Sequence, residues 1–336
     1  MKWSFSPKWQ IDQKWLEKIN NLAWTFGRRK KKTTLEGLVG IVETQTGIAI
    51  TYGVASGSQM IIKAQSYQAA EDLAAKQDAL IKFVNNHQLQ GVPCSYVLAN
   101  DNYSLNLIEA PAVAKEEMNQ ALRWVLKDIV NFPMEEAVVN TFPLPYVRAR
   151  DSLKMIYAVV MRKNIIPQIE NLIVPSGLVL TIVDIPELIL KNILNRYPKE
   201  VKSCACVQIT EKIGKLILCR DKQLCITRTF ELKLDEFGKA PEQDAKILES
   251  LALEIQRSFD YMNSVFRQSI SNVIVLAPTL LNGHLIAEYL KNTLGAEINL
   301  LKLSECLTFE TPLKEEEEPN YLFAVGALLR EEENLE

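Results

Sequence analysis

The feature that most constrains the fold is a unit of strand, polar turn, strand and strand that occurs twice. The first copy opens at Val39 within the stretch Leu38–Ile50, where two apolar runs rich in β-branched residues flank a polar turn ending in Gly47. This pattern predicts a buried hairpin. The second copy opens at Cys204 and shares the arrangement without residue identity. We therefore expect a two-lobed α/β protein with a cleft between the lobes.

Apolar periodicity predicts the other elements. Helices are expected at residues 69–87, 115–130, 164–175, 187–195, 241–267, 281–294 and 321–329. Strands beyond the first hairpin are expected at residues 59–64, 95–98, 103–108, 137–142, 153–160, 178–183, 203–209, 215–219, 223–230, 272–276 and 297–301. The strands at 95–98 and 103–108 are expected to join at the turn Asn100–Asn102, and the nearly continuous apolar strand at 153–160 is expected to be central. The acidic run Glu315–Glu318 before Pro319 predicts a solvated linker.

These elements divide into four regions. Residues 1–36 form a basic amphipathic extension, 37–182 the first lobe, 183–310 the second lobe, and 311–336 an acidic linker with a C-terminal helix that returns to the first lobe. A chain of 336 residues with 48% hydrophobic and 24% charged residues is long enough for about two domains. Apolar runs such as Met155–Met161 are far shorter than the roughly 20 residues of a membrane span. The N-terminus also lacks the apolar segment of a signal peptide.

The six cysteines lie mostly in apolar runs, which predicts reduced, buried thiols of a cytosolic protein. Cys204 and Cys206 share one face of a strand, but no histidine is near them in the sequence, so packing is favoured over metal binding. His87 and His284 are the only histidines, and no nucleophile motif accompanies them.

The first 36 residues are basic and rich in tryptophan. Nine Lys or Arg residues stand against Asp12, Glu17 and Glu36, a balance of +6 in a chain whose net charge is −3. Apolar residues between Gln10 and Phe26 follow helical spacing. Candidate residues for a membrane surface are Trp3, Trp9, Trp15, Trp24, Arg28, Arg29, Lys30, Lys31 and Lys32. An anionic membrane surface suits such a segment, and packing of the segment on its own body suits it equally well. No nucleic-acid partner is expected, because the body is acidic and has no recognition module.

Four distinctive parts of the sequence are Lys115–Trp124 with Asn131–Ala137, then Val183–Leu188, Ile255–Tyr261 and Phe323–Arg330. They resemble segments of the PilM family of type IV pilus assembly proteins. The first stretch resembles a family helix that ends in a phenylalanine-proline turn before Glu-Glu-Ala. The second resembles the interlobe segment, the third the long helix and the fourth the closing helix. The resemblance covers roughly residues 37–330 in the same order and is greatest to the MSHA-pilus branch, with a more distant likeness to the cytoplasmic domain of GspL. It implies a two-lobed actin-like ATPase fold with a duplicated, ribonuclease H-like core, as in sugar kinases.

The resemblance also implies where a nucleotide site would lie. An ATPase of this class uses an Asp in each hairpin to hold Mg²⁺ through water, glycines in both turns and a Gly-Gly pair after a later strand. The corresponding positions in this chain are Val42 and Thr44, then Gln208 and Thr210, then Ala277 and Pro278. Val42 offers no ligand atom, Gln208 is neutral, and Pro278 lacks a backbone N–H. Glu43 is adjacent to Val42, but its side chain points to the opposite face of the strand.

We therefore expect weak or no ATP binding, no hydrolysis, no catalytic residue and no metal site, with the turn residues serving only to close the hairpins. The alternative is a divergent ATP-binding ATPase or sugar-kinase-like enzyme. The resemblance implies a cytoplasmic platform, peripheral at the inner membrane, that docks a membrane-anchored PilN-like protein. A short cytoplasmic peptide of that partner would lie in a groove of the first lobe.

Overall fold

The computed structural model describes residues 36–44, 46–57, 59–114, 117–144, 154–197, 203–210, 212–232, 237–266, 273–279 and 282–330. The basic, tryptophan-rich extension, with the candidate membrane-surface residues from Trp3 to Lys32, lies outside these ranges, as does the predicted helix start at Lys115.

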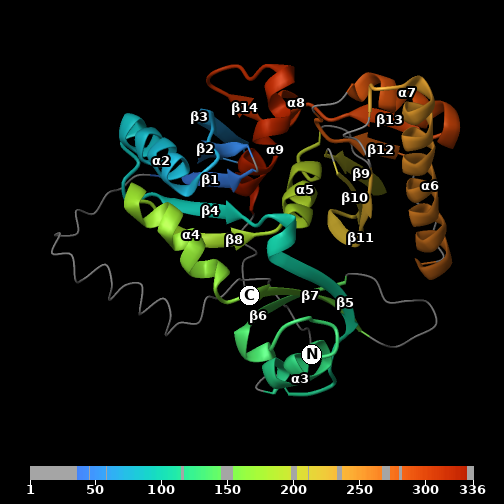
Figure 1. Ribbon diagram of the computed structural model, residues 1–336, viewed down its shortest axis with the longest axis horizontal. Coiled ribbons are helices and arrows are strands. Elements are labelled where there is room, and N and C mark those ends of the chain that lie inside the picture. The colour runs from blue at the N-terminus through green and yellow to red at the C-terminus, as the bar shows by residue number, and fades with distance from the viewer. Residues whose placement is uncertain are drawn as a thin grey trace.

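The first lobe is built on a six-stranded sheet with the order β14-β3-β2-β1-β4-β8 (Figure 1). Its strands are β1 (Leu38–Glu43), β2 (Gly47–Ser56), β3 (Gln59–Ala69), β4 (Pro93–Val97), β8 (Val179–Asp184) and β14 (Thr308–Phe309). Strands β1, β2 and β3 form an antiparallel meander, whereas β4 is parallel to β1 and β8 is parallel to β4. The predicted hairpin is confirmed, and the third strand continues five residues beyond its predicted end at residue 64.

Helices cover both faces of this sheet (Figure 1). They are α2 (Leu73–His87) and α4 (Ile165–Ile173), followed by the 3₁₀ turn η3 (Val174–Ser176), on one side, and α9 (Glu318–Gly326) with η6 (Ala327–Leu329) on the other. Helix α9 packs directly on β1 at Gly40, where an added Cβ would lie 2.0 Å from the carbonyl oxygen of Ala324. Only glycine permits this approach. In the described part of the chain, the last α-helix thus packs against the first strand.

The second lobe repeats the first. Its strands are β9 (Ser203–Ile209), β10 (Ile213–Arg220), β11 (Gln223–Glu231), β12 (Val273–Leu276) and β13 (Glu297–Leu300). The sheet order β11-β10-β9-β12-β13 places an antiparallel meander beside two parallel strands, as in the first lobe. Helices α6 (Pro241–Phe266) and α7 (Gly283–Leu294) pack against one another. The predicted architectural repeat is therefore confirmed at the level of sheet topology.

A small antiparallel sheet projects from the first lobe at one end of the molecule (Figure 1). It consists of β5 (Tyr103–Glu109), β7 (Met155–Arg162) and β6 (Ala137–Pro143), covered by α3 (Met118–Leu126), with 3₁₀ turns η1 (Asn100–Asn102) and η2 (Met134–Glu136) at its borders. Strand β7 is central, as its apolar run predicted. The strands predicted at 95–98 and 103–108 are confirmed and are joined through η1, after which β5 leaves the first sheet and pairs with β7.

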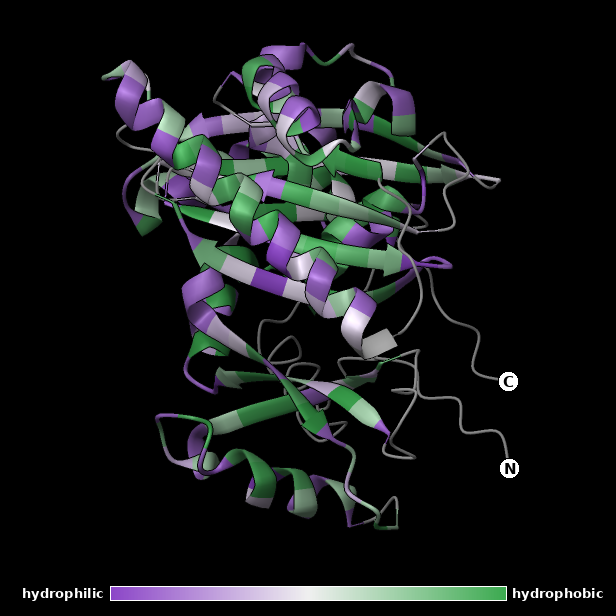
Figure 2. Ribbon diagram, turned by 90° about the vertical axis from the view of Figure 1, so that its right-hand side faces the viewer, coloured by the Kyte–Doolittle hydropathy of each residue, from purple (hydrophilic) through white to green (hydrophobic). Residues whose placement is uncertain are grey.

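Helix α5 (Pro186–Leu194) lies between the lobes and contacts α9, β10 and β11. One continuous buried cluster joins residues of both lobes, and apolar residues concentrate in the strands (Figure 2). The described cysteines are free thiols, and all but Cys306 are buried. In the described part of the chain, no helix is both long and apolar enough to span a membrane.

The acidic linker prediction requires a correction. Glu315–Glu317 form the exposed 3₁₀ turn η5, but Glu318 begins α9 and is 2% exposed. Its Oε2 accepts the backbone N–H of Leu303, which begins the short helix α8 (Leu303–Cys306), at 3.0 Å. Burial raises the pKa of the Glu318 carboxyl. This acidic residue therefore has a structural role in joining α9 to α8.

Candidate functional site

The two hairpin turns have matching geometry. In the first, the Thr44 N–H and Oγ1 both donate to the carbonyl of Gly47, at 2.8 and 3.2 Å. In the second, the Thr210 N–H and Oγ1 both donate to the carbonyl of Ile213, at 2.9 and 3.0 Å. The two threonines therefore occupy equivalent places in the two lobes. Each hydroxyl closes its own turn, which is the structural role that the sequence predicted for these residues.

Val42 lies inside the first lobe. It is 8% exposed and is paired across the hairpin with Ala49, itself fully buried. An isopropyl group in this place has no lone pair for a metal-bound water. The position therefore contributes packing and cannot contribute a metal ligand.

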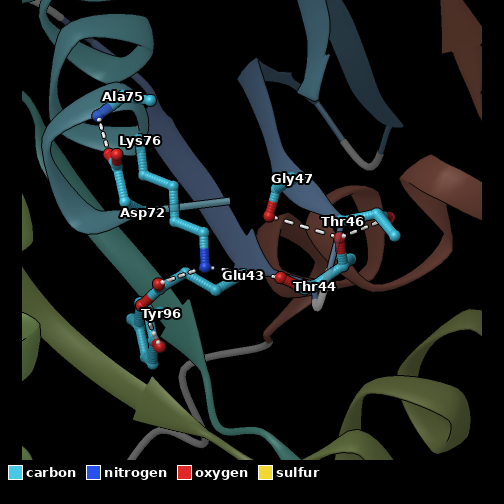
Figure 3. Close-up of polar contacts among 8 residues, drawn as sticks. All are labelled: Glu43, Thr44, Thr46, Gly47, Asp72, Ala75, Lys76 and Tyr96. Atoms are coloured by element: carbon cyan, nitrogen blue, oxygen red, sulfur yellow. Dashed lines mark hydrogen bonds and ion pairs between the residues drawn. The ribbon is translucent and has the colours of Figure 1, made fainter. Parts of the chain in front are cut away.

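Glu43 is engaged by neighbouring side chains (Figure 3). The Tyr96 hydroxyl donates to its Oε1 at 2.7 Å, and the Lys76 ammonium donates to its Oε2 at 3.1 Å. Asp72 caps the helix that carries Lys76 by accepting the N–H of Ala75 at 2.8 Å. Burial and the Glu43 charge raise the pKa of Tyr96. The carboxylate of Glu43 is therefore neutralised within the first lobe and is not free to replace the missing Asp.

Gln208 lies opposite Lys215 in the register of β9 and β10, so the two side chains project from the same face of the second sheet. Gln208 is 5% exposed. Position 208 therefore carries a neutral amide opposite a lysine, whereas Mg²⁺ binding would require a carboxylate there.

Lys215 is the centre of a buried polar cluster that joins three parts of the chain. Its ammonium donates to Glu187 Oε1 at 2.5 Å, to Asn100 Oδ1 at 2.8 Å and to the Tyr103 hydroxyl at 3.1 Å. The Tyr103 hydroxyl donates to Glu187 Oε2 at 2.6 Å. Burial lowers the pKa of Lys215, while burial and the Glu187 charge hold the pKa of Tyr103 well above its ordinary value. The cluster ties β10 of the second lobe to α5 and to the base of the small sheet.

The third predicted element follows β12. The Ala277 N–H donates to the Val207 carbonyl at 2.9 Å, and the Thr279 hydroxyl donates to the Ile209 carbonyl at 3.3 Å. Ala277 is buried and Pro278 is partly exposed. The structure therefore brings Ala277 and Pro278 alongside the end of β9, near Gln208 and Thr210, whereas Val42, Glu43 and Thr44 lie in the other lobe.

The residues at these positions do not fit a magnesium nucleotide. Val42 is apolar, Glu43 is paired, and Gln208 is neutral opposite a cation, so none of these three described positions presents a free carboxylate. Within the described ranges, no group of three or more His, Cys, Asp or Glu side chains is arranged to hold a metal.

The sequence interpretation missed the Lys215 cluster. Lys215 is the one charged residue within the apolar run Ile213–Cys219, and a lone charge in a buried strand is the signal that could have identified it. Its partners come from two other stretches, Asn100 with Tyr103 and then Glu187, so only the fold shows that they meet.

Comparisons with known proteins complete the description of the fold. No protein-family model and no curated protein matches the sequence. Among solved structures, the chain is similar to the PilM-PilN type IV pilus biogenesis complex, with 18% identity, a TM-score of 0.69, and coverage of 87% of this chain and 97% of that chain. The fold is actin-like. This likeness confirms the predicted fold class, and the second sheet repeats the order of five strands of the first, β3-β2-β1-β4-β8.

Two further structures are more distant. One is the cytoplasmic domain of EpsL, an inner membrane component of the type II secretion system of Vibrio cholerae, with 12% identity, a TM-score of 0.48, and coverage of 88% of this chain and 96% of that chain. The other is a Bacteroides thetaiotaomicron protein with an actin-like ATPase fold and unknown function, with 10% identity, a TM-score of 0.47, and coverage of 84% and 96%.

Proposed function

We propose that this chain is a non-catalytic, cytoplasmic assembly-platform component of a type IV pilus machine, peripheral at the inner membrane. In this proposal it belongs to the PilM-like group, beside MshI of the MSHA pilus, and docks a membrane-anchored PilN-like protein of the MshJ type. The observation that carries the proposal is the likeness to the PilM-PilN complex across 87% of this chain and 97% of that chain.

The chemistry of the hairpins supports a platform in preference to an ATPase. The positions where the fold would hold metal and phosphate carry buried Val42, paired Glu43 and neutral Gln208. Capture of a peptide needs no catalytic group and relies on an open strand edge or groove. The proposal therefore assigns to the first lobe a binding role that its residues can fulfil.

Strand β8 is our choice for the docking edge. It is the outermost strand on its side of the described sheet and pairs only with β4 there. Val179 at its start is 47% exposed, and Thr181 is exposed as well. An extended peptide that adds to this edge would use backbone hydrogen bonds for affinity and contacts with exposed side chains for selectivity.

The test is a titration of the full chain into a labelled peptide copied from the cytoplasmic N-terminus of the PilN-like protein, followed by fluorescence anisotropy. We expect saturable binding, and we expect Val179→Lys to weaken it by about tenfold, which corresponds to about 1.4 kcal/mol. Leu285→Lys is the matched control, since Leu285 is 44% exposed on α7 of the other lobe. A peptide that fails to bind, together with failure of the intact partner to co-purify from membranes, would reject the proposed function.

The basic extension supplies a second contact in this proposal, with the anionic membrane surface. Its Lys, Arg and Trp residues suit the headgroup region. Flotation with vesicles that contain anionic lipid, comparing the full chain with a chain lacking residues 1–32, tests the contact. Equal flotation of the two chains would rule it out.

A further inference from the structure

Helix α3 borders a groove at the outer end of the small sheet. The groove has a volume of about 720 Å³, and Val113, Trp124, Val125 and Met134 contribute its apolar lining. It lies away from β8 and from both hairpins, because α3 covers the far side of the small sheet (Figure 1). It is therefore separate from the docking edge and the nucleotide positions considered above.

Large apolar side chains remain exposed beside this groove. Trp124 is 70% exposed, whereas Leu122 and Leu126 on the other face of the same helix are at most 4% exposed. Val125 and Val113 are also exposed, at 38% and 37%. Clustered apolar exposure of this kind marks a surface that binds another segment.

Charges of both signs line the groove, and the two cations lie against backbone carbonyls and the Trp124 ring. Arg123 uses its guanidinium on the backbone carbonyls of Met134 and Ala137, and the Lys127 ammonium lies 3.4 Å from the centre of the Trp124 ring. Glu117 and Glu135 line the groove and are exposed. Among the described residues, neither carboxylate has an ion-pair partner, and Lys163 donates to the backbone carbonyl of Glu135 instead. The apolar lining suits aromatic side chains, and the two exposed carboxylates offer partners for Lys or Arg.

This chain contains such a segment outside the described structure. We call residues 1–35 the tryptophan head. It holds four of the five tryptophans, and Trp124 in the groove is the fifth. The described chain starts at Glu36, whose carbonyl accepts the Tyr52 hydroxyl at 2.8 Å. Thirty-five residues can extend to about 120 Å, whereas a globule of about 300 residues has a radius of gyration of about 19 Å. The tryptophan head can therefore reach the groove.

We propose that the tryptophan head docks in the α3 groove of its own chain, with aromatic side chains on the apolar lining and Lys or Arg beside Glu117 and Glu135. Docking there withholds the same residues from an anionic membrane, so the groove acts as an internal competitor for the head. The proposal rests on the groove and on the composition of the head, and it does not require the proposed pilus function.

The test replaces Trp124 in the full chain by the photoreactive residue p-benzoylphenylalanine, which keeps an aromatic group in the groove. We expect irradiation to give a product of monomer mass in which position 124 is joined to a peptide from residues 1–35. The same photoreactive residue at Leu285 is the control and should give no product with the head. A product of dimer mass, or no product, overturns the proposal.

Charge reversal provides a second readout. The double variant Glu117→Lys with Glu135→Lys, made in the photoreactive chain, should lower the yield of the head product at least fivefold, because it removes both carboxylates from an exposed surface. In the otherwise native chain, Trp124→Ala should raise flotation with anionic vesicles. If the yield of the head product and the flotation with vesicles are both unchanged, the proposed competition between groove and membrane for the head is overturned. Circular dichroism confirms that each variant is folded.

Discussion

The ammonium of Lys215 and the carboxylate of Glu187 lie 2.5 Å apart, with side-chain exposures of only 2% and 4%. The pair crosses from β10 of the second lobe to α5, and Tyr103 and Asn100 complete its hydrogen bonds from the first lobe. A buried ion pair of this kind is costly to break, because the remaining partner keeps an uncompensated charge. The pair and its hydrogen-bond partners therefore link β10 of the second lobe to α5 and to the first lobe.

Removing one partner of this pair should destabilise the protein strongly. Lys215→Met leaves Glu187 buried and unpaired, so we expect a loss of about 3–5 kcal/mol in the free energy of unfolding. The double variant Lys215→Met with Glu187→Gln should lose less than Lys215→Met alone, because no charge stays behind. Urea unfolding measures both. A double variant that is less stable than the single variant would contradict the idea that the unpaired Glu187 charge causes the loss.

Asp184 should make stability depend on pH in a defined direction. It is 1% exposed, and burial raises its pKa despite the Arg330 guanidinium at 3.3 Å and the N–H of Ile185. A carboxyl whose folded pKa is raised contributes stability that is complete below its unfolded pKa of about 3.9 and is lost as pH rises through the folded value. The free energy of unfolding of the native chain, relative to Asp184→Asn, should therefore fall as pH rises from about 4.

Urea unfolding of both proteins at a series of pH values checks this prediction. The steepest fall expected from one group is about 1.4 kcal/mol per pH unit. Parallel curves, or a difference that increases with pH, would contradict the raised pKa.

Gly326 allows α9 to cross α5 closely. A Cβ at this position would lie 2.4 Å from Ile189 Cγ2 and 2.8 Å from Ile193 Cδ1. We expect Gly326→Ala to lose about 1–3 kcal/mol through overpacking. Gly283→Ala is the matched control, since the nearest atom to its added Cβ is at 3.6 Å in ordinary contact. Thermal unfolding should separate the two variants, and equal melting temperatures would mean that α5 and α9 move apart at little cost.

Magnesium ATP at millimolar concentration should leave the melting temperature nearly unchanged. Ligand at about 100 times its dissociation constant would stabilise the folded protein by about 2.7 kcal/mol, which thermal shift detects readily. A nucleotide-binding actin-fold protein measured alongside is the control for the assay. A saturable shift of this chain would contradict the interpretation of Val42 and Gln208 and restore the ATPase alternative.

The elements and their order were predictable because buried strands and amphipathic helices follow local periodicity. The end of β3 could not be predicted in this way, because Gln65, Ser66 and Gln68 are polar. These residues are held in the strand by pairing with β2. Glu318 was read as solvated, since its partner Leu303 is brought near only by the fold.

In the candidate site, too, residue types were predictable from the sequence, whereas contacts between distant segments were not. The altered residue types at the hairpins were visible in the sequence, and so was the strand face of Glu43. Its pairing with Lys76 and Tyr96 was not visible, because those residues come from α2 and β4. The exposure of Trp124 also depends on tertiary structure, since its helical spacing alone is compatible with a buried position.

The return of α9 and β14 to the first lobe sets an order for folding during synthesis. Strand β14 pairs with β3, and α9 covers β1 and β2, although these segments are separated by about 250 residues. The strands of the second lobe, from Ser203 to Leu300, leave the ribosome before α9 does. A nascent chain that ends before Glu318 therefore contains every described strand of the second lobe, while the face of the first sheet that α9 covers is still open to solvent.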